Sequence, residues 1–159
     1  MITVMGVPEL RLRRATAADV PRLEEVVQAA YGHYVARLGG QPRPMTDDYA
    51  DVVRDRHVAV AERGGEIVGL IVLVVSDGGF FVDNVAVDPS HQGTGVGRAL
   101  LEYAEVEARR AGFDSISLYT HEKMTENLAY YARIGYVEYD RRRHGEARLV
   151  YMRKQLPDG

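Results

Sequence analysis

The sequence predicts an α+β protein, an α/β arrangement around one mixed β-sheet. Residues 57–75 contain two strand-like runs joined by a glycine turn, which makes an antiparallel hairpin. A segment with helical periodicity separates the strands expected at residues 80–87 and 115–120, and such a crossover makes its two strands parallel. Because both kinds of pairing occur in one chain, the expected sheet is mixed.

The first expected elements are a strand and a long helix. Residues 9–14 (ELRLRR) alternate as a half-buried strand does. Thr16 and Asp19 have the spacing of a capping box, which predicts the start of a helix. We expect this helix over residues 17–38, where apolar residues recur at three- and four-residue intervals. These residues are Val20, Leu23, Val27, Ala30, Tyr34 and Leu38.

The middle of the chain changes from helix to strand. After a loop rich in glycine and proline, a short helix is expected over residues 46–55. Residues 57–75 then form the hairpin, with its turn at Gly64 and Gly65. The next strand, at residues 80–87 (FFVDNVAV), is rich in β-branched and aromatic residues.

The second half alternates helices and strands. Helices are expected over residues 95–111 and 125–134, and strands over residues 115–120, 136–143 and 147–154. On the first of these helices we expect one apolar stripe, formed by Gly97, Leu101, Ala104, Ala108 and Ala111. Charged residues are expected on its opposite face, namely Arg98, Glu102, Glu105 and Arg109. The order β-α-α-β-β-β-α-β-α-β-β gives about seven strands and four helices.

Composition narrows the class of protein. A chain of 159 residues is expected to form one domain over residues 1–159. The absence of cysteine excludes thiol nucleophiles, and the histidines lack metal-ligand spacing, so no metal is predicted. A net charge of -3 argues against nucleic acid as a partner. The longest apolar run, residues 67–75, is about half the length that crosses a bilayer. With no signal-peptide pattern, we expect no membrane partner and a cytoplasmic location.

The stretch HQGTGVGRALL, residues 91–101, places three glycines directly before a helix. Backbone amides at a helix start form a site for anions, and glycines let phosphate oxygens approach. A P-loop would need Lys and then Ser or Thr where Arg98 and Ala99 stand. A dinucleotide fingerprint would need G-x-G-x-x-G directly after a strand and an acidic residue downstream, and this sequence has neither.

A third interpretation fits the loop and two further segments. Gln92-x-x-Gly95-x-Gly97 resembles the coenzyme A pyrophosphate loop of the GNAT superfamily of acyl-CoA-dependent N-acyltransferases. Residues 127–136 (NLAYYARIGY) resemble the second motif of that superfamily, and residues 13–23 are similar to its first strand and helix. The resemblance covers nearly the whole chain. It implies a strongly twisted sheet that splays between the strands at residues 80–87 and 115–120.

The resemblance also implies a cofactor and its contacts. Acetyl-CoA would be the cosubstrate, with its pyrophosphate on the loop and its pantetheine arm paired along the strand as if it were a strand itself. Tyr131 would donate a proton to the coenzyme A sulfur, and Asn127 would bind the arm. The complete set of implied cofactor contacts is Val85, Ala86, Val87, Gln92, Gly93, Thr94, Gly95, Val96, Gly97, Arg98, Asn127 and Tyr131.

The general base and the acceptor pocket are less constrained. Asp83 is a candidate base, because strand alternation places it on the same face as Val85 and Val87; a strand-edge charge or salt-bridge partner is the equal alternative. His121 is a second candidate. The acceptor side is expected at residues 31–45, and we expect its binding residues among Tyr31, Tyr34, Arg37, Arg43, Asp83 and His121.

The predicted function is N-acetylation of a primary amine on a small molecule or peptide, by direct attack within a ternary complex. One alternative is a noncatalytic acyl-CoA-binding or sensor module on the same fold. A protein–protein adaptor without a cofactor fits less well with the intact glycine loop. Members of the superfamily often dimerise through their terminal strands, so a homodimer is a further expectation from the resemblance.

Overall fold

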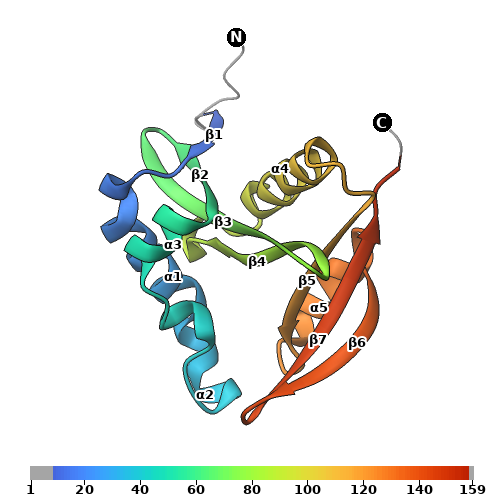
Figure 1. The fold of residues 1–159 in the computed structure, drawn as a ribbon. Coiled ribbons are helices and arrows are strands. Elements are labelled where there is room, and N and C mark those ends of the chain that lie inside the picture. The colour runs from blue at the N-terminus through green and yellow to red at the C-terminus, as the bar shows by residue number, and fades with distance from the viewer. Residues whose placement is uncertain (1–8, 158–159) are drawn as a thin grey trace.

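A computed structural model describes residues 9–157, and within this range seven strands form one sheet in the order β1-β2-β3-β4-β5-β7-β6 (Figure 1). The strands are β1 (Leu10–Arg14), β2 (His57–Arg63), β3 (Glu66–Ser76), β4 (Gly79–Val87), β5 (Ser115–His121), β6 (Val137–His144) and β7 (Ala147–Gln155). β4 and β5 are parallel and the other neighbours are antiparallel. The mixed-sheet α+β class predicted from the sequence is therefore confirmed.

Helices cover both faces of the sheet, and each face has its own buried cluster. One face carries α1 (Val20–Tyr31), α2 (Val35–Leu38) and α3 (Tyr49–Asp55), and the other carries α4 (Val96–Arg110) and α5 (Thr125–Arg133) (Figure 1). Leu23, Val27, Val60 and Leu70 belong to the cluster under α1. The cluster under α4 and α5 includes Ala59, Ile71, Leu100, Leu118 and Tyr136.

The first helical region differs from the single helix expected over residues 17–38. Residues 17–19 form a 3-10 turn, α1 ends at Tyr31, and a second 3-10 turn at residues 32–34 leads into the short α2. Gly32 is a weak helix former, so the chain changes its winding there. The expected capping contact is present, since the Thr16 amide donates to Asp19 Oδ2 at 2.8 Å.

Two other helices also differ in detail from those expected from the sequence. α3 begins at Tyr49 rather than Thr46, because the Asp48 side chain accepts the amide of Ala50 at 3.0 Å and caps the helix there. The buried stripe of α4 is shifted from the expected one. It includes Val96 and Leu100, whereas Ala111 is exposed. Glu105 is not on the solvent face either: Lys154 donates to it at 2.9 Å.

A β-bulge at Asp83 accompanies the divergence of β4 from β5. Val72 pairs with Asn84 and Leu73 with Val82, so Asp83 is the extra residue in β4. β4 and β5 share only the pairs Phe81–Ser117 and Val82–Leu118 among the described residues. Beyond the bulge the two strands separate, as the resemblance implied (Figure 1).

The bulge also reverses the alternation of side chains along β4. The cluster under α4 and α5 includes two residues before the bulge, Phe80 and Val82. Two residues after the bulge, Val85 and Val87, pack against the same cluster. Asp83 contacts arginines from the α3 side instead. The expectation that Asp83 shares a face with Val85 and Val87 is therefore wrong, because one extra residue shifts the alternation by one position.

Candidate active site

A cavity of about 590 Å³ lies where β4 and β5 diverge. It is bounded by the end of α1, the loop at residues 38–44, both diverging strands, α5 and the turn between β6 and β7. Of the residues expected at the site, it is lined by Tyr31, Arg43, Asp83, Val85, His121, Asn127 and Tyr131. Residues from both halves of the chain thus meet at one place.

The edge of β4 that faces this gap has no strand partner after Val82 among the described residues. Val85 and Val87 direct their carbonyl groups to this edge: Val85 O lies 3.2 Å from Tyr31 Oη, and Gln92 Nε2 donates to Val87 O at 3.3 Å. Asp88, one residue further on, instead donates its amide toward β3, to Val68 O at 2.9 Å. The open edge therefore presents backbone groups to which an extended ligand can bind.

The glycine loop lies between the end of β4 and α4, outside the lining of the cavity. Gly93 and Gly95 have φ of 77° and 93°, a left-handed backbone that other residues rarely adopt. Gly97 has an ordinary φ, and a Cβ there would lie 3.6 Å from the side chain of Val87. The first turn of α4 contains no acidic residue, so its amides and dipole present positive potential to the loop.

Asn127 and Tyr131 lie one helical turn apart on α5 and both line the cavity. Tyr131 is 8% exposed, and its ring packs edge-on against Tyr130 and Tyr136. The Tyr131 hydroxyl, like any tyrosine hydroxyl, is protonated at neutral pH and can act as a donor, and burial raises its pKa further. Tyr130 packs against the core from a half-buried position.

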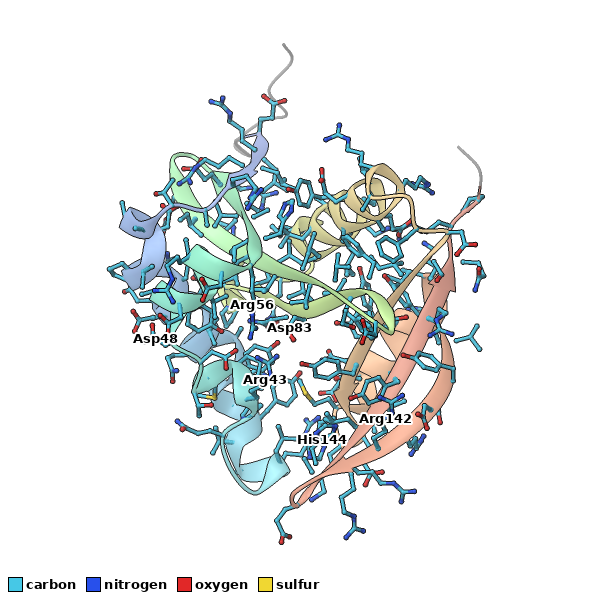
Figure 2. All side chains as sticks on the ribbon, in the orientation of Figure 1. Arg43, Asp48, Arg56, Asp83, Arg142 and His144 are labelled. Atoms are coloured by element: carbon cyan, nitrogen blue, oxygen red, sulfur yellow. The ribbon has the colours of Figure 1, made fainter. Side chains whose placement is uncertain are left out.

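Asp83 lies beside Arg43 and Arg56 (Figure 2), and Tyr119 also contacts it. Its Oδ2 accepts Arg56 Nη1 at 2.8 Å and lies 3.4 Å from Arg43 Nη2, while its Oδ1 accepts Tyr119 Oη at 2.8 Å. Arg43 Nη2 also donates to Tyr119 Oη at 2.9 Å. Burial and the Asp83 charge raise the pKa of Tyr119 to about 12. The carboxylate is therefore already engaged at both oxygens.

A second polar network lies beneath Tyr31. Tyr31 Oη donates to Asn84 Oδ1 at 2.6 Å, and Asn84 Nδ2 donates to Tyr49 Oη at 3.2 Å. Tyr49 in turn donates to Pro44 O at 2.6 Å, which ties α3 to the loop that walls the cavity. Asn84 is 5% exposed, and its position as a polar residue in an apolar strand is the signal that sequence reasoning passed over.

His121 lines the cavity but is poorly arranged as a base. Its Nδ1 accepts the amide of Lys123 at 3.1 Å, so neutral His121 carries its proton on Nε2 and its basic nitrogen is occupied. Burial, together with Lys123, lowers the pKa of His121 below its usual value. This arrangement favours a neutral hydrogen-bond donor at the cavity wall.

Tyr34 and Arg37 do not line the cavity. Arg37 Nη1 donates to Glu126 Oε1 at 2.5 Å, and its guanidinium lies 5.0 Å from the centre of the Tyr34 ring. These two residues join α2 to the first turn of α5. Arg43, which was also expected on the acceptor side, does line the cavity, together with Tyr119 and Tyr151.

Two negative findings apply to residues 9–157. No group of three or more histidine or acidic side chains there is arranged to hold a metal ion. None of the helices in this range has the length and apolar character needed to cross a membrane.

A family comparison identifies the chain. Residues 21–136 match the model of the "Acetyltransferase (GNAT) family", and the chain belongs to this family. The matched range runs from α1 to the end of α5 and so contains both the open edge of β4 and the glycine loop.

Individual relatives agree with the family assignment. An IAA acetyltransferase of Azospirillum brasilense is 34% identical over 86 residues, which are 53% of this chain and 56% of that protein. The chain thus spans about half the length of this curated relative.

Solved structures share the fold. The PaiA N-acetyltransferase of Thermoplasma acidophilum in complex with coenzyme A matches 92% of this chain and 99% of its own, at a TM-score of 0.79 and 17% identity. The ribosomal-protein-S18-alanine N-acetyltransferase of Escherichia coli matches 95% and 96%, at a TM-score of 0.75 and 20% identity.

Proposed function

We propose that this protein transfers an acetyl group from acetyl-CoA to a primary amine of a small molecule or peptide, by direct attack in a ternary complex. The observation that carries the proposal is the unpaired edge of β4, which lines the cavity at Val85 and continues to Val87, shortly before the glycine loop. At the loop end, Gly93 and Gly95 adopt left-handed conformations immediately before α4. This arrangement suits a long ligand with a peptide-like arm and an anionic end.

The residues present fit coenzyme A. The amides of Val85 and Val87 point to the open edge, and each carbonyl has one polar neighbour, Tyr31 or Gln92, and keeps a lone pair for an amide of a pantetheine arm. Asn127 lies across the gap from this edge, on α5. When bound, acetyl-CoA supplies the activated acyl group as a thioester, and no metal is required.

Three groups of the protein would assist the chemistry. The backbone amide of Val85 on the open edge would stabilise the negative charge that develops on the acyl oxygen. Tyr131, whose hydroxyl is protonated at neutral pH, would donate its proton to the leaving sulfur, and the proton lost by the attacking nitrogen would pass through solvent and restore the tyrosine. The cavity between α1, Tyr119 and the β6–β7 turn would hold the amine for attack.

Asp83 has a different role in this proposal from that of a simple base. Protonating it would weaken its ion pairs with Arg56 and Arg43 and its hydrogen bond with Tyr119. We therefore assign Asp83 to positioning the side chains at the floor of the cavity. Proton removal by Asp83, as expected from the sequence, is the competing role.

The test combines titration calorimetry with thiol release. Acetyl-CoA should bind with micromolar affinity, and members of a broad panel of primary amines should release free thiol. Tyr131→Phe should lower kcat while leaving the affinity for acetyl-CoA largely unchanged, because the hydroxyl acts on the leaving group. Tyr103→Phe removes a hydroxyl from α4 outside the cavity and serves as the matched control.

Two outcomes would oppose the proposal. Absence of acetyl-CoA binding would refute it. Tight binding without thiol release across the whole panel would favour the noncatalytic acyl-CoA-binding module instead.

A further inference from the structure

Arg63, the last residue of β2, lies on the α4 side of the sheet. Leu10, which lies opposite Arg63 on β1, packs against the cluster under α4, and Ala61, two positions before Arg63, belongs to that cluster. From this position Arg63 Nη1 donates to Thr94 Oγ1 at 2.9 Å. Thr94 stands between the two left-handed glycines of the loop, so a guanidinium supports the loop from beneath.

This guanidinium is only partly satisfied. Its Nε is buried and has no hydrogen-bond partner in the part of the chain that the structure describes. The two acidic residues next to it on the hairpin are paired elsewhere: Glu62 with Arg13 at 2.8 Å, and Glu66 with Arg22 at 3.0 Å. No carboxylate of the described residues forms an ion pair with Arg63.

The surroundings make the absence of a counterion costly. The N-terminus of α4 carries positive potential from its dipole, and no acidic residue occupies its first turn. Arg98 adds another cation there, paired with Glu102 at 3.1 Å on the exposed face. The positive charge of Arg63 near this helix start is electrostatically unfavourable when the loop is empty. It becomes favourable when an anion binds at the loop.

We infer that Arg63 is a positioning residue for the pyrophosphate of coenzyme A: it fixes the loop through Thr94 and supplies charge from the β2 side. The inference rests on the proposed function. It adds a residue outside the glycine motif, from a strand that the motif does not include. A diphosphate is the ligand class that this arrangement suits, because the start of α4 and the guanidinium both favour negative charge at the loop.

The experiment is titration calorimetry of coenzyme A with the intact chain, at low and at physiological salt. Arg63→Gln should raise the Kd for coenzyme A about tenfold at low salt and make the affinity less dependent on salt, since one charge at the site is lost. Arg63→Lys should recover most of the affinity. Thr94→Val should raise the Kd while keeping the salt dependence of the wild type, because it breaks the loop contact but retains the charge.

Arg11→Gln is the matched control. Arg11 on β1 lies opposite Glu62 on β2, the neighbour of Arg63, so its side chain is on the other face of the sheet from Arg63. Arg11→Gln changes the net charge by the same amount as Arg63→Gln. This variant should bind coenzyme A like the wild type. If Arg63→Gln also binds like the wild type, the inference is overturned while the proposed function stands. If the wild type itself fails to bind coenzyme A, the proposed function falls. Thermal unfolding of each variant shows that binding is compared between folded proteins.

Discussion

Gly69 on β3 lies directly against α4, and replacing it tests how tightly that helix packs on the sheet. A Cβ at this position would lie 2.9 Å from Val96 Cγ1, 3.1 Å from Leu100 Cδ1 and 3.1 Å from Ala86 O. Carbon atoms in good contact are about 3.5–4.0 Å apart, so Gly69→Ala creates an overlap of roughly half an ångström or more. Val96 and Leu100 are almost fully buried and have little room to move.

The expected cost follows from these contacts. Overpacking a core typically costs about 1–3 kcal/mol, and the better strand propensity of alanine offsets about 0.5–1 kcal/mol. We therefore expect Gly69→Ala to lower the free energy of unfolding by about 1–2 kcal/mol. Because Val96 is the first residue of α4, its displacement should also weaken coenzyme A binding at the adjacent loop.

Urea denaturation followed by circular dichroism measures the change in unfolding free energy. Gly32→Ala is the matched control, because its φ is -55° and a Cβ there meets nothing within 4 Å. This control should be neutral or stabilise the protein by up to about 1 kcal/mol. An unchanged urea midpoint for Gly69→Ala would show that β3 and α4 are not packed as described.

Three other perturbations test separate features. Gly95→Ala forces alanine into a φ of 93° and should cost about 1–2 kcal/mol and weaken coenzyme A binding, measured by denaturation and calorimetry; unchanged values would contradict the loop conformation. The hydrogen bond from Arg13 lowers the pKa of Asp19 to about 2, so its stabilisation is present above pH 3.8 and lost as the pH falls through 2. Asp19→Asn should flatten the acid dependence of unfolding between these values, and a profile identical to the wild type would refute the ion pair. Asp83→Asn should reduce stability and raise the KM for the amine while keeping the shape of the kcat–pH profile; loss of the acidic limb would show that Asp83 is the base.

Much of the fold could be predicted because local signals and tertiary structure agree. The hairpin turn at Gly64 and Gly65, the crossover helix and both terminal strands occur where periodicity places them. The break after Tyr31 was missed because apolar spacing continues through Gly32 into α2, although the backbone changes to a 3-10 turn there. Periodicity reports which faces are buried, and it does not report how the backbone winds.

Some residues of the candidate site could likewise be predicted from the sequence, and others could not. The glycine loop, Asn127 and Tyr131 belong to contiguous motifs and can be found along the chain. Tyr119 and Arg56 could not, because they meet Asp83 only after strands and loops distant in sequence are assembled. The bulge at Asp83 has no unambiguous local signature, and a single extra residue was enough to reverse the predicted side of that carboxylate.

The divergence of β4 from β5 also bears on aggregation. An unpaired strand edge ordinarily invites pairing with a strand of another molecule. Here the unpaired edge is internal, enclosed between α1 on one side and β5 and α5 on the other (Figure 1). We expect such an enclosed edge to admit a single extended arm more readily than the edge of a second sheet with its flanking strands and helices. The arrangement should therefore limit edge-to-edge pairing between molecules.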